Sequence, residues 1–328
     1  MTNSSRVTPS PNKGSLVFVT GGAGFIGRNV ARKLGKNGDT VIGIGHGNLS
    51  RAEQTAAGFH SWYPLSVNSK NIERMITDHG EPDSIVHAAG VGSVGAAEKA
   101  PLKDFHGTVV ATAEITDVMR RQLPDTKLIF LSSAAIYGDQ NAQRLHETAP
   151  RQPASVYGFH KAQCEDICLD AARRWNLDIN IVRFFSVYGN GLRKQLFWDI
   201  SQKILRDAVI SLKGNGEETR DFIHINDAVS IITTLLSLRS ASPILINGGT
   251  GIRTSIRTAA ETLITASGTH RDVCFNGEII RSDPQSLVAD VSQLDTLGWE
   301  PKVSFAEGMR GYWQWVTLQN SGVMPNSR

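Results

Sequence analysis

Short apolar runs alternate with amphipathic segments through the first half of the chain. The runs LVFVT, TVIGI, SIVHAAG, KLIFLSS and INIVRFF occupy residues 16–20, 40–44, 84–90, 127–133 and 179–185. Helical patterns lie between several of them, at 25–37, about 103–122 and about 157–175. Continuously apolar strands separated by helices are typical of a parallel sheet that is covered on both faces. With right-handed crossovers, this order predicts a doubly wound α/β fold.

After Phe185 the pattern becomes less regular. VYGNGLRKQ is interpreted as a loop, and a helix follows to about Arg206. The segment VISLKGNGEETRDFIH predicts a β-hairpin around its Gly-Asn-Gly turn. A helix from Asn226 and the strand PILING then return the chain to the sheet. We therefore expect a Rossmann-type domain over residues 15–186 plus about 226–249. A smaller, discontinuous α/β lobe for the substrate is expected over about 187–225 plus 250–328.

Charge and composition exclude several classes of partner. The 328 residues include 34 Lys and Arg against 31 Asp and Glu, without a basic stripe, so we expect no nucleic-acid partner. No apolar stretch approaches the ~18 residues that span a bilayer, so no membrane partner is expected. Residues 1–14 lack the apolar centre of a secretory signal and are interpreted as a disordered lead-in. Cys164, Cys168 and Cys274 make no disulfide framework, which favours a cytoplasmic location, and we expect no metal site.

A glycine-rich turn, VTGGAGFIG at 19–27, lies between the first strand and the first helix. Gly21 permits a tight turn, Gly24 lets backbone N–H groups approach a pyrophosphate, and Gly27 lets the helix pack closely on the strand. The helix N-terminus adds a partial positive charge that faces the phosphates. An ordinary strand–helix turn is the competing interpretation. The context favours dinucleotide binding by the turn, with contacts from Gly21, Gly24, Phe25, Ile26 and Gly27.

A second motif, Tyr-x-x-x-Lys, places Tyr157 and Lys161 on one face of a helix, one turn apart. The lysine ammonium would hold the phenol oxygen in a positive field and lower its pKa toward the working range. A solvated helix face is the alternative, because this spacing is common. Ser132 and Ser133, however, end a strand at the carboxyl edge of the sheet, where ligands bind in open α/β folds.

Taken in order, these and further motifs resemble one family over nearly the whole chain. The matching segments are TGGAGFIG, HAAG, LSSAAIYGD, YGFHK, RFFSVYG, RDFIHINDA, NGGTG and DPQSLVADVSQLDTLGWEP. They run in family order from about residue 16 to 316. The chain therefore resembles an extended short-chain dehydrogenase/reductase of the NAD(P)-dependent nucleotide-sugar epimerase/dehydratase family, similar to UDP-glucose 4-epimerases.

The resemblance implies a role for each matched position. Tyr157 is implied as the catalytic acid/base, Lys161 as its electrostatic partner, and Ser133 as the hydrogen-bond partner of the reacting sugar oxygen. The small residues Ala88, Ala89 and Gly90 are expected along the cofactor. A nucleoside-diphosphate sugar is the implied substrate, and its expected contacts are Ser93, Ser133, Ser186, Lys194, Arg220 and Arg281.

Some of these implied contacts have a physical rationale. The guanidinium forks of Arg220 and Arg281 suit bidentate binding of the pyrophosphate of a sugar nucleotide. Lys194 and Trp198 follow the VYG loop and are candidates for a lid or for substrate contacts, although a tryptophan there equally suits packing. The helix that contains Thr112, together with the helix after Tyr157, resembles the family's dimer-forming pair. A homodimer is therefore expected.

Four departures from the family pattern bear on the cofactor and the substrate. Gly45 and His46 stand where NAD-users usually carry an acidic residue, and Arg51 follows closely. Losing that carboxylate removes repulsion against a 2′-phosphate, with which Arg51 could pair, so the cofactor is NAD or NADP(H), with NADP(H) slightly favoured. Other expected cofactor contacts are Ser66, where an acid commonly meets adenine, and Val67. Ser186 replaces the usual asparagine of the VYG motif, and Thr108 replaces another.

The residues after Ser133 narrow the reaction. Ala134 and Ala135 stand where 4,6-dehydratases of the family carry an Asp-Glu pair, and methyl groups cannot transfer protons. Hydride transfer at C4 of a nucleoside-diphosphate hexose remains, either in a 4-epimerase, which is favoured, or in an NADPH-dependent 4-ketoreductase. A non-catalytic dinucleotide-binding scaffold is a remote alternative, because Ser133, Tyr157 and Lys161 are all present.

Overall fold

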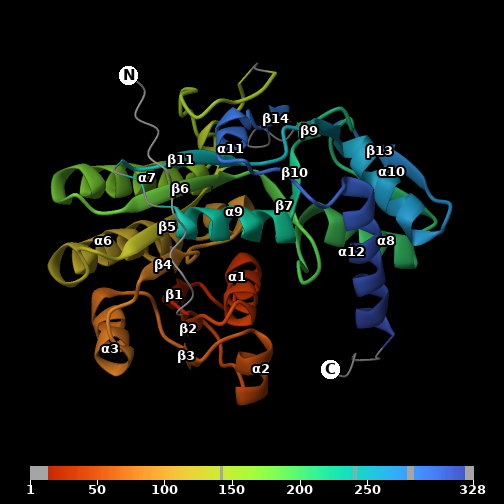
Figure 1. Cartoon of the computed structure of the whole chain (residues 1–328). Helices are drawn as coiled ribbons and strands as arrows, with labels where there is room; N and C mark the ends of the chain where they lie inside the picture. Colours follow the sequence, from red (N-terminus) through yellow and green to blue (C-terminus); the bar gives the residue numbers. More distant parts are fainter. Residues whose placement is uncertain (1–13, 141–142, 239, 241, 279–283, 322–328) are drawn as a thin grey trace. The chain divides into compact units, whose positions relative to one another are not determined.

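Seven strands form one parallel sheet in the order β11-β6-β5-β4-β1-β2-β3 (Figure 1). The computed structural model describes residues 14–140, 143–238, 240, 242–278 and 284–321. The strands are β1 Leu16–Thr20, β2 Thr40–Ile44, β3 Ser61–Tyr63, β4 Ser84–His87, β5 Lys127–Ser133, β6 Ile179–Phe184 and β11 Leu245–Gly248. The expected doubly wound α/β sheet is confirmed, and the order reverses between β1 and β4, where such folds bind ligands.

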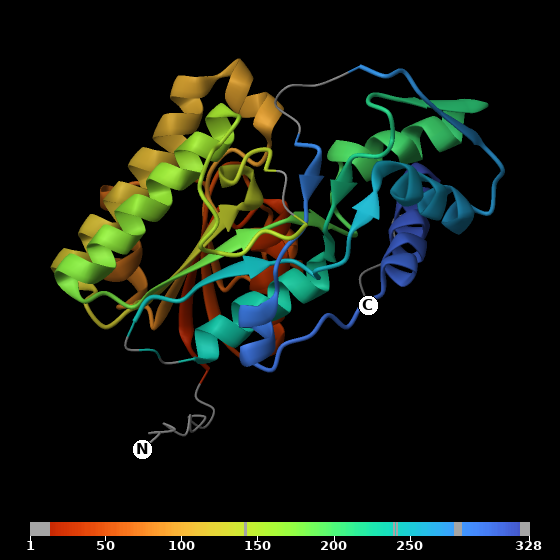
Figure 2. The ribbon, with the colours of Figure 1, turned by 90° about the horizontal axis from the view of Figure 1, so that it is seen from above.

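Helices cover both faces of this sheet. Figures 1 and 2 show α3, α6 and α7 on one face, and α1 and α9 on the other. The helices of this region are α1 Phe25–Lys36, α2 Arg51–Ala56, α3 Ser69–His79, α4 Val94–Lys99, α5 Pro101–Phe105, α6 Ala111–Gln122, α7 Val156–Trp175 and α9 Ile225–Ser237. The apolar faces of α3, α6 and α7 cover one core, which contains fully enclosed residues such as Phe18, Ile85 and Ile115. Burial of both sheet faces explains why the strands read as continuous apolar runs.

The helix expected over about 103–122 is interrupted by a π-helical turn, η1 His106–Val110, which joins α5 to α6. Such turns widen a helix locally and often occur at functional sites. Here it contains Thr108, whose hydroxyl donates to Asp104 Oδ1 at 2.8 Å in a fully buried position.

The chain divides into two compact units. Unit 1 comprises the described residues up to Ser132, with Gln163–Val182 and Val229–Leu245, and unit 2 comprises Ser133–Ala162, Arg183–Ala228 and the described residues from Ile246. This division differs from the expected domain boundaries, mainly because residues 133–162 belong to unit 2. The assignment of the two expected domains to cofactor and substrate stays a prediction.

Unit 2 has its own core. The helices α8, α10 and α12 pack around aromatic side chains that include Tyr188, Phe197, Phe222 and Tyr312. The helical elements of this unit are η2 Ala134–Ile136, α8 Gln195–Arg206, α10 Ile256–Ser267, α11 Ser292–Thr296 and α12 Phe305–Asn320. Its short strands are β7 Ser186–Tyr188, β8 Val209–Leu212, β9 Thr219–Arg220, β10 Phe222–His224, β12 Thr254–Ser255, β13 Asp272–Phe275 and β14 Ser286–Leu287.

The expected hairpin over 209–224 is wrong. Strand β8 pairs in parallel with β13, whereas β9 pairs with β12 and β14. The Gly-Asn-Gly turn is closed by a side chain instead of a strand ladder, because the Glu218 carboxylate accepts from Asn215 N at 3.0 Å and Gly216 N at 2.9 Å. This local capping satisfies the turn and leaves both flanking strands available to other partners.

Candidate functional site

The glycine turn after β1 requires a residue without a side chain at position 21. Gly21 has φ +65°, and a Cβ there would lie 2.6 Å from the carbonyl carbon and oxygen of Ala88. Ala88 follows β4, so the turn and the β4 loop touch backbone to backbone at the point where the strand order reverses. The amide of Gly24 closes the turn by donating to Gly21 O at 2.8 Å. The turn therefore joins β1 to α1 beside the loop after β4, while its role in ligand binding stays a prediction.

The N-terminus of α1 offers unsatisfied backbone donors. Its N-cap is Gly24, which supplies no side-chain hydrogen bond, so the N–H groups of Phe25, Ile26 and Gly27 have no partner from a cap. A Cβ on Gly27 would lie 2.5 Å from Gly21 O, so glycine lets the helix start directly on the turn. Bare N–H groups at a helix N-terminus suit the pyrophosphate of a dinucleotide. The residues present therefore fit the expected cofactor.

A buried chain of hydrogen bonds holds the loop beneath the turn. Ala89 N donates to Thr20 Oγ1 at 3.2 Å, and Thr20 Oγ1 lies 2.6 Å from His87 Nδ1. On the other side of the imidazole, His87 Nε2 lies 3.1 Å from Thr112 Oγ1, which donates to Thr108 O at 2.7 Å. Because the Thr112 proton points away from the ring, Nε2 carries the ring proton and Nδ1 accepts from Thr20. Sequence reasoning missed this chain, since each of its residues is ordinary when taken alone.

The residues expected near the adenosine follow β2, and they differ in burial and in their hydrogen bonds. Gly45 is buried beside Gly21, and a Cβ on it would lie 3.1 Å from the Trp62 ring. His46 is exposed. Arg51 starts α2 and donates from Nη1 to His60 O at 3.1 Å, so part of its guanidinium is already engaged within the protein.

The remaining expected cofactor contacts of unit 1 lie on loops after β3 and β4. Ser66 is exposed and Val67 packs against the core. Gly90 has φ +131°, and a Cβ there would lie 2.8 Å from Oγ1 of Thr108 in the π-helical turn. Thr108 therefore packs directly against the loop at Gly90. Ser93, expected as a substrate contact, caps α4 by accepting from Ala96 N at 3.3 Å.

In unit 2, the expected catalytic residues lie on two neighbouring elements. Ser133 ends β5, and its Oγ accepts from Ala135 N at 3.2 Å, which starts η2. Tyr157 and Lys161 lie on the first turns of α7, with Lys161 Nζ 6.0 Å from the centre of the Tyr157 ring. Lys161 is 5% exposed, while Tyr157 is half-buried. The buried Lys161 ammonium and the more accessible Tyr157 phenol therefore lie on neighbouring turns of the same helix face.

Gly158 joins these two elements. A Cβ on Gly158 would lie 2.4 Å from Ala135 O, so the first turn of α7 contacts the η2 backbone directly. Gly158 N donates to Ser155 Oγ at 3.1 Å, which fixes the start of the helix. The close approach of Gly158 to Ala135 brings the segment that carries Ser133 beside the turn that carries Tyr157. Sequence reasoning quoted Gly158 within YGFHK but gave it no role.

The expected substrate contacts of unit 2 are separated from one another along the chain. Ser186 is half-buried in β7, and Arg220 is 8% exposed in β9 and donates to Thr219 O at 2.8 Å. Lys194 is the N-cap of α8, and burial lowers the pKa of its ammonium. The next residue, Gln195, has φ +67°, a strained value for a non-glycine residue and one often found at functional sites.

Arg281 and Trp198 are the remaining expected positions. Arg281 lies outside the described residues. Trp198 packs its ring against Trp315, with ring centres 5.9 Å apart, which favours the packing interpretation of this tryptophan.

The structure thus groups the expected residues into two sets. In unit 1 it brings the glycine turn, Gly45 and the Ala88–Ala89 loop together. In unit 2 it brings the Ser133 segment, Tyr157 and Lys161 together. The exposed His46 and the engaged Arg51 form no comparable cluster.

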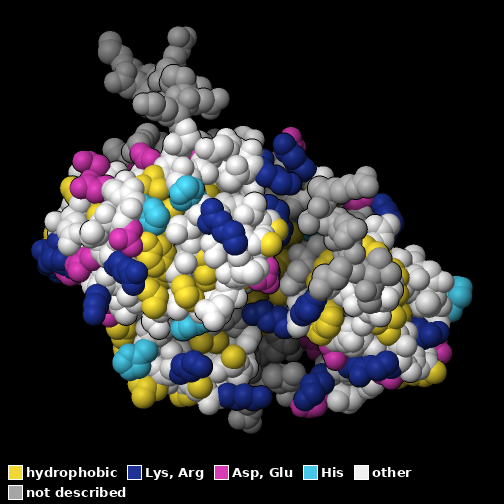
Figure 3. All heavy atoms as spheres, turned by 90° about the horizontal axis from the view of Figure 1, so that it is seen from below, with side chains coloured by type: hydrophobic (Ala, Val, Ile, Leu, Met, Phe, Trp, Pro, Cys, Tyr) yellow, Lys and Arg dark blue, Asp and Glu magenta, His cyan; other side chains and the backbone are white. Residues whose placement is uncertain are grey.

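On the face drawn in Figure 3, Lys and Arg side chains are spread widely instead of gathered into one stripe. Within the described residues, no helix combines the length and the apolarity that a bilayer crossing requires.

Comparisons with known proteins agree with this arrangement. UDP-glucose 4-epimerase of Dictyostelium discoideum is 28% identical over 342 residues, covering 93% of this chain and 97% of that protein. A crystal structure of UDP-glucose 4-epimerase from Thermotoga maritima, with UDP-glucose, has a TM-score of 0.84 at 25% identity and covers 93% of this chain and 99% of its own.

A further structure shows the same fold. UDP-glucuronic acid 4-epimerase from Bacillus cereus, in complex with UDP-glucuronic acid and NAD, has a TM-score of 0.82 at 23% identity and covers 93% of this chain and 99% of its own. The family model for the NAD-dependent epimerase/dehydratase family matches residues 17–248, which is well over half of the chain. The chain therefore belongs to the NAD-dependent epimerase/dehydratase family.

Proposed function

We propose that the protein is an NAD-dependent 4-epimerase of nucleoside-diphosphate hexoses, most simply of a UDP-hexose. The observation that carries this proposal is the backbone contact of Gly158 with Ala135, which brings the Ser133 segment beside Tyr157 while Lys161 lies one turn away. The relatives support the substrate class, because those described above are named as epimerases of UDP-sugars.

The chain's own residues account for the proton transfers. Ser133 Oγ would hold the sugar C4 oxygen, and the Tyr157 phenol would take the hydroxyl proton and later return it. The Lys161 ammonium, one helical turn away, would place a positive charge near the phenol during this transfer. A bound nicotinamide dinucleotide would accept a hydride from C4 and give it back to the opposite face of the ketone.

We infer that the cofactor is NAD, held by the glycine turn and the N–H groups of α1. The slight preference for NADP(H), drawn from the missing acidic residue, is not supported. The family model is described as NAD-dependent and the Bacillus cereus structure contains NAD. Arg51, the proposed partner of a 2′-phosphate, donates to His60 O. Glu53, two residues further along α2, adds a carboxylate whose charge would repel such a phosphate.

A 4-ketoreductase is the second candidate, and the observation that favours it is the absence of a carboxylate at Gly45 and His46. A 4,6-dehydratase is disfavoured, because the Ala134 and Ala135 side chains are methyl groups next to Ser133. The two candidates differ in how they use the cofactor. An epimerase regenerates it in each cycle, whereas a ketoreductase consumes one reduced cofactor per turnover.

The corresponding experiment measures turnover without added cofactor. The purified protein, with any NAD(H) that co-purifies, is incubated with UDP-glucose, UDP-galactose and their uronic acid counterparts, and sugar configuration is read by NMR. Interconversion of C4 epimers without added cofactor supports the epimerase and excludes the reductase. A parallel incubation contains a 4-keto sugar nucleotide and NADPH. Conversion of this substrate alone, with stoichiometric NADPH oxidation, would overturn the proposal.

A variant tests the assigned proton donor. Tyr157→Phe removes the phenol oxygen and keeps the ring, so we expect turnover to be abolished while NAD affinity stays within a few-fold, as measured by fluorescence titration. Unchanged turnover in this variant would contradict the assignment of Tyr157.

We also propose a cytoplasmic homodimer built on α6 and α7. The proposal is supported by the family resemblance of this helix pair and by the three cysteines, none of which forms a disulfide. Sedimentation velocity of the purified protein tests it, and a monomer at micromolar concentration would contradict it.

A further inference from the structure

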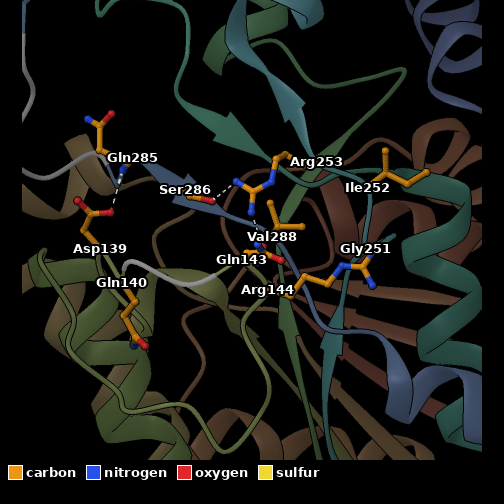
Figure 4. A pocket seen from close by; sticks show the side chains of 10 residues that line it. All are labelled: Asp139, Gln140, Gln143, Arg144, Gly251, Ile252, Arg253, Gln285, Ser286 and Val288. Carbon is orange, nitrogen blue, oxygen red and sulfur yellow. Dashed lines mark hydrogen bonds between the residues drawn. The ribbon is translucent and has the colours of Figure 1, made fainter.

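A cavity of about 1070 Å³ lies within unit 2, and none of the residues assigned to the reaction lines it. Its walls are the loop after η2, the loop before β12, and strand β14 with its flanking residues (Figure 4). A volume of this size corresponds to pockets that hold small organic ligands.

The cavity opens on the opposite face of a small sheet from the expected substrate arginine. In the parallel pairing of β14 with β9, Ser286 lies opposite Thr219 and Leu287 lies opposite Arg220. Adjacent strand residues point to opposite faces. Arg253 Nη1 donates to Thr219 Oγ1 at 3.0 Å and to Ser286 Oγ at 2.8 Å, so these groups share the cavity face. Arg220 therefore points away from the cavity, together with Leu287, which packs against the buried cluster of η2.

Two arginines, Arg144 and Arg253, place positive charge on the cavity wall. Figure 4 shows the Arg253 guanidinium directed toward Ser286 and Gln143, and the Arg144 side chain extending toward Gly251. Arg253 donates to neutral oxygens within the described residues, namely Thr219 Oγ1, Ser286 Oγ and Gln143 O. Within the described part of the chain, neither arginine forms an ion pair with a carboxylate.

The one acidic side chain on the cavity wall has a structural partner. Asp139 Oδ1 accepts from Gln285 N at 2.9 Å, which ties the loop after η2 to the start of β14. The pKa of a second carboxylate, Asp290, is lowered by hydrogen bonds from Ser292 and, to a smaller extent, by the charge of nearby Arg144. Neither carboxylate forms an ion pair with either arginine within the described residues, so both guanidinium groups keep donors that a ligand could use. Guanidinium forks with free donors bind phosphate and carboxylate groups in a bidentate manner.

Apolar groups flank this charged region. Ile252 is 60% exposed, although a large aliphatic side chain gains from burial, and Val288 contributes a second apolar surface. Glutamine side chains line the same walls and can donate to or accept from hydroxyl groups. A ligand that carries an anionic end and a larger organic body would satisfy both regions.

We propose that this cavity binds an organic phosphate at a site separate from the reaction site, with the phosphate between Arg144 and Arg253 and the organic body against Ile252. This proposal does not depend on the proposed epimerase activity, because it rests on residues that the reaction does not use. It assigns a binding role to the loops at 143–144 and 251–253, which the sequence motifs left without one.

The test uses the full-length protein and glucose 1-phosphate as the probe, with inorganic phosphate and glucose as comparison ligands, in isothermal titration calorimetry. We expect Arg144→Gln and Arg253→Gln each to weaken glucose 1-phosphate binding at least tenfold. Arg310→Gln, on the exposed side of α12, is expected to bind it as the unaltered protein does. Arg220→Gln distinguishes binding in this cavity from binding at the expected substrate site. Ile252→Ser is expected to weaken glucose 1-phosphate more than inorganic phosphate.

Several results would overturn the proposal. Unchanged binding in Arg144→Gln, or loss of all binding in Arg220→Gln, would show that the probe binds elsewhere. Equal affinities for inorganic phosphate and glucose 1-phosphate would refute the contact of an organic body with Ile252. Arg144 makes no hydrogen bond within the described residues, so Arg144→Gln removes no such contact from the fold. This variant therefore keeps the test valid if Arg253→Gln is unstable. Circular dichroism and thermal unfolding check the fold of every variant.

Discussion

The contact between Gly158 and Ala135 provides a quantitative test of the proposed catalytic arrangement. A Cβ at position 158 would lie 2.4 Å from Ala135 O, whereas ordinary contacts begin at 3.4 Å. Gly158→Ala must therefore move the start of α7 and η2 apart by about 1 Å. A misplacement of about 1 Å between reacting groups can reduce turnover about 100-fold. This factor corresponds to about 2.7 kcal/mol of transition-state stabilisation.

The same substitution has two opposing effects on stability. Alanine in place of glycine within a helix adds about 1 kcal/mol to the free energy of unfolding. Crowding against Ala135 subtracts about 1–3 kcal/mol. We expect Gly158→Ala to be unchanged or slightly less stable, and to lose turnover much more than NAD affinity. Urea unfolding measures the first quantity, and NMR-monitored epimerisation of a UDP-hexose measures the second.

Gly311→Ala is the matched control. Gly311 lies within α12, and a Cβ there would meet no heavy atom within 4 Å. This variant should gain about 1 kcal/mol of stability and keep full turnover, because helix propensity acts without crowding. If Gly158→Ala behaves in the same way as Gly311→Ala, the proposed packing of the Ser133 segment against the Tyr157 turn is refuted.

Three further perturbations have defined outcomes. Gly21→Ala should weaken NAD binding at least tenfold in a fluorescence titration, while Gly38→Ala, which has φ +93° and open space, should cost only about 1 kcal/mol of backbone strain and leave NAD affinity unchanged. Thr20→Val leaves two buried polar groups without their hydroxyl partner, so urea unfolding should show a loss of about 1–3 kcal/mol; a loss below about 0.5 kcal/mol would contradict this. Burial lowers the pKa of His224, and nearby Asp227 opposes this shift only in part. The unfolded chain then binds more protons below about pH 6.5, so the free energy of unfolding should fall with acidification, and His224→Asn should reduce this fall.

The sequence predicted the sheet well for a physical reason. Strands buried on both faces must be apolar throughout, so LVFVT, TVIGI and KLIFLSS match β1, β2 and β5 residue for residue. The hairpin prediction failed because its turn is closed by the Glu218 carboxylate, and a glycine turn in sequence does not reveal whether strands or a side chain close it.

The candidate site was predictable only in part. The glycine turn and the Tyr157–Lys161 pair depend on spacings of three or four residues, which a sequence displays directly. The role of Gly158 depends on Ala135, which is distant in the sequence, so spacing gives no sign of it. Arg51 illustrates the opposite error, since its position suggested a free cation, while its side chain donates to His60 O.

The buried hydrogen bonds from Ala89 to Thr108 have a fixed polarity. The series begins at a backbone amide, which can only donate, and ends at a backbone carbonyl, which can only accept. Every intermediate hydroxyl and the imidazole must then orient in the same sense, so the series admits a single proton order and its dipoles add head to tail. With a single ring proton on His87, the loss of any one hydroxyl would interrupt this ordered series between the loop after β4 and the π-helical turn.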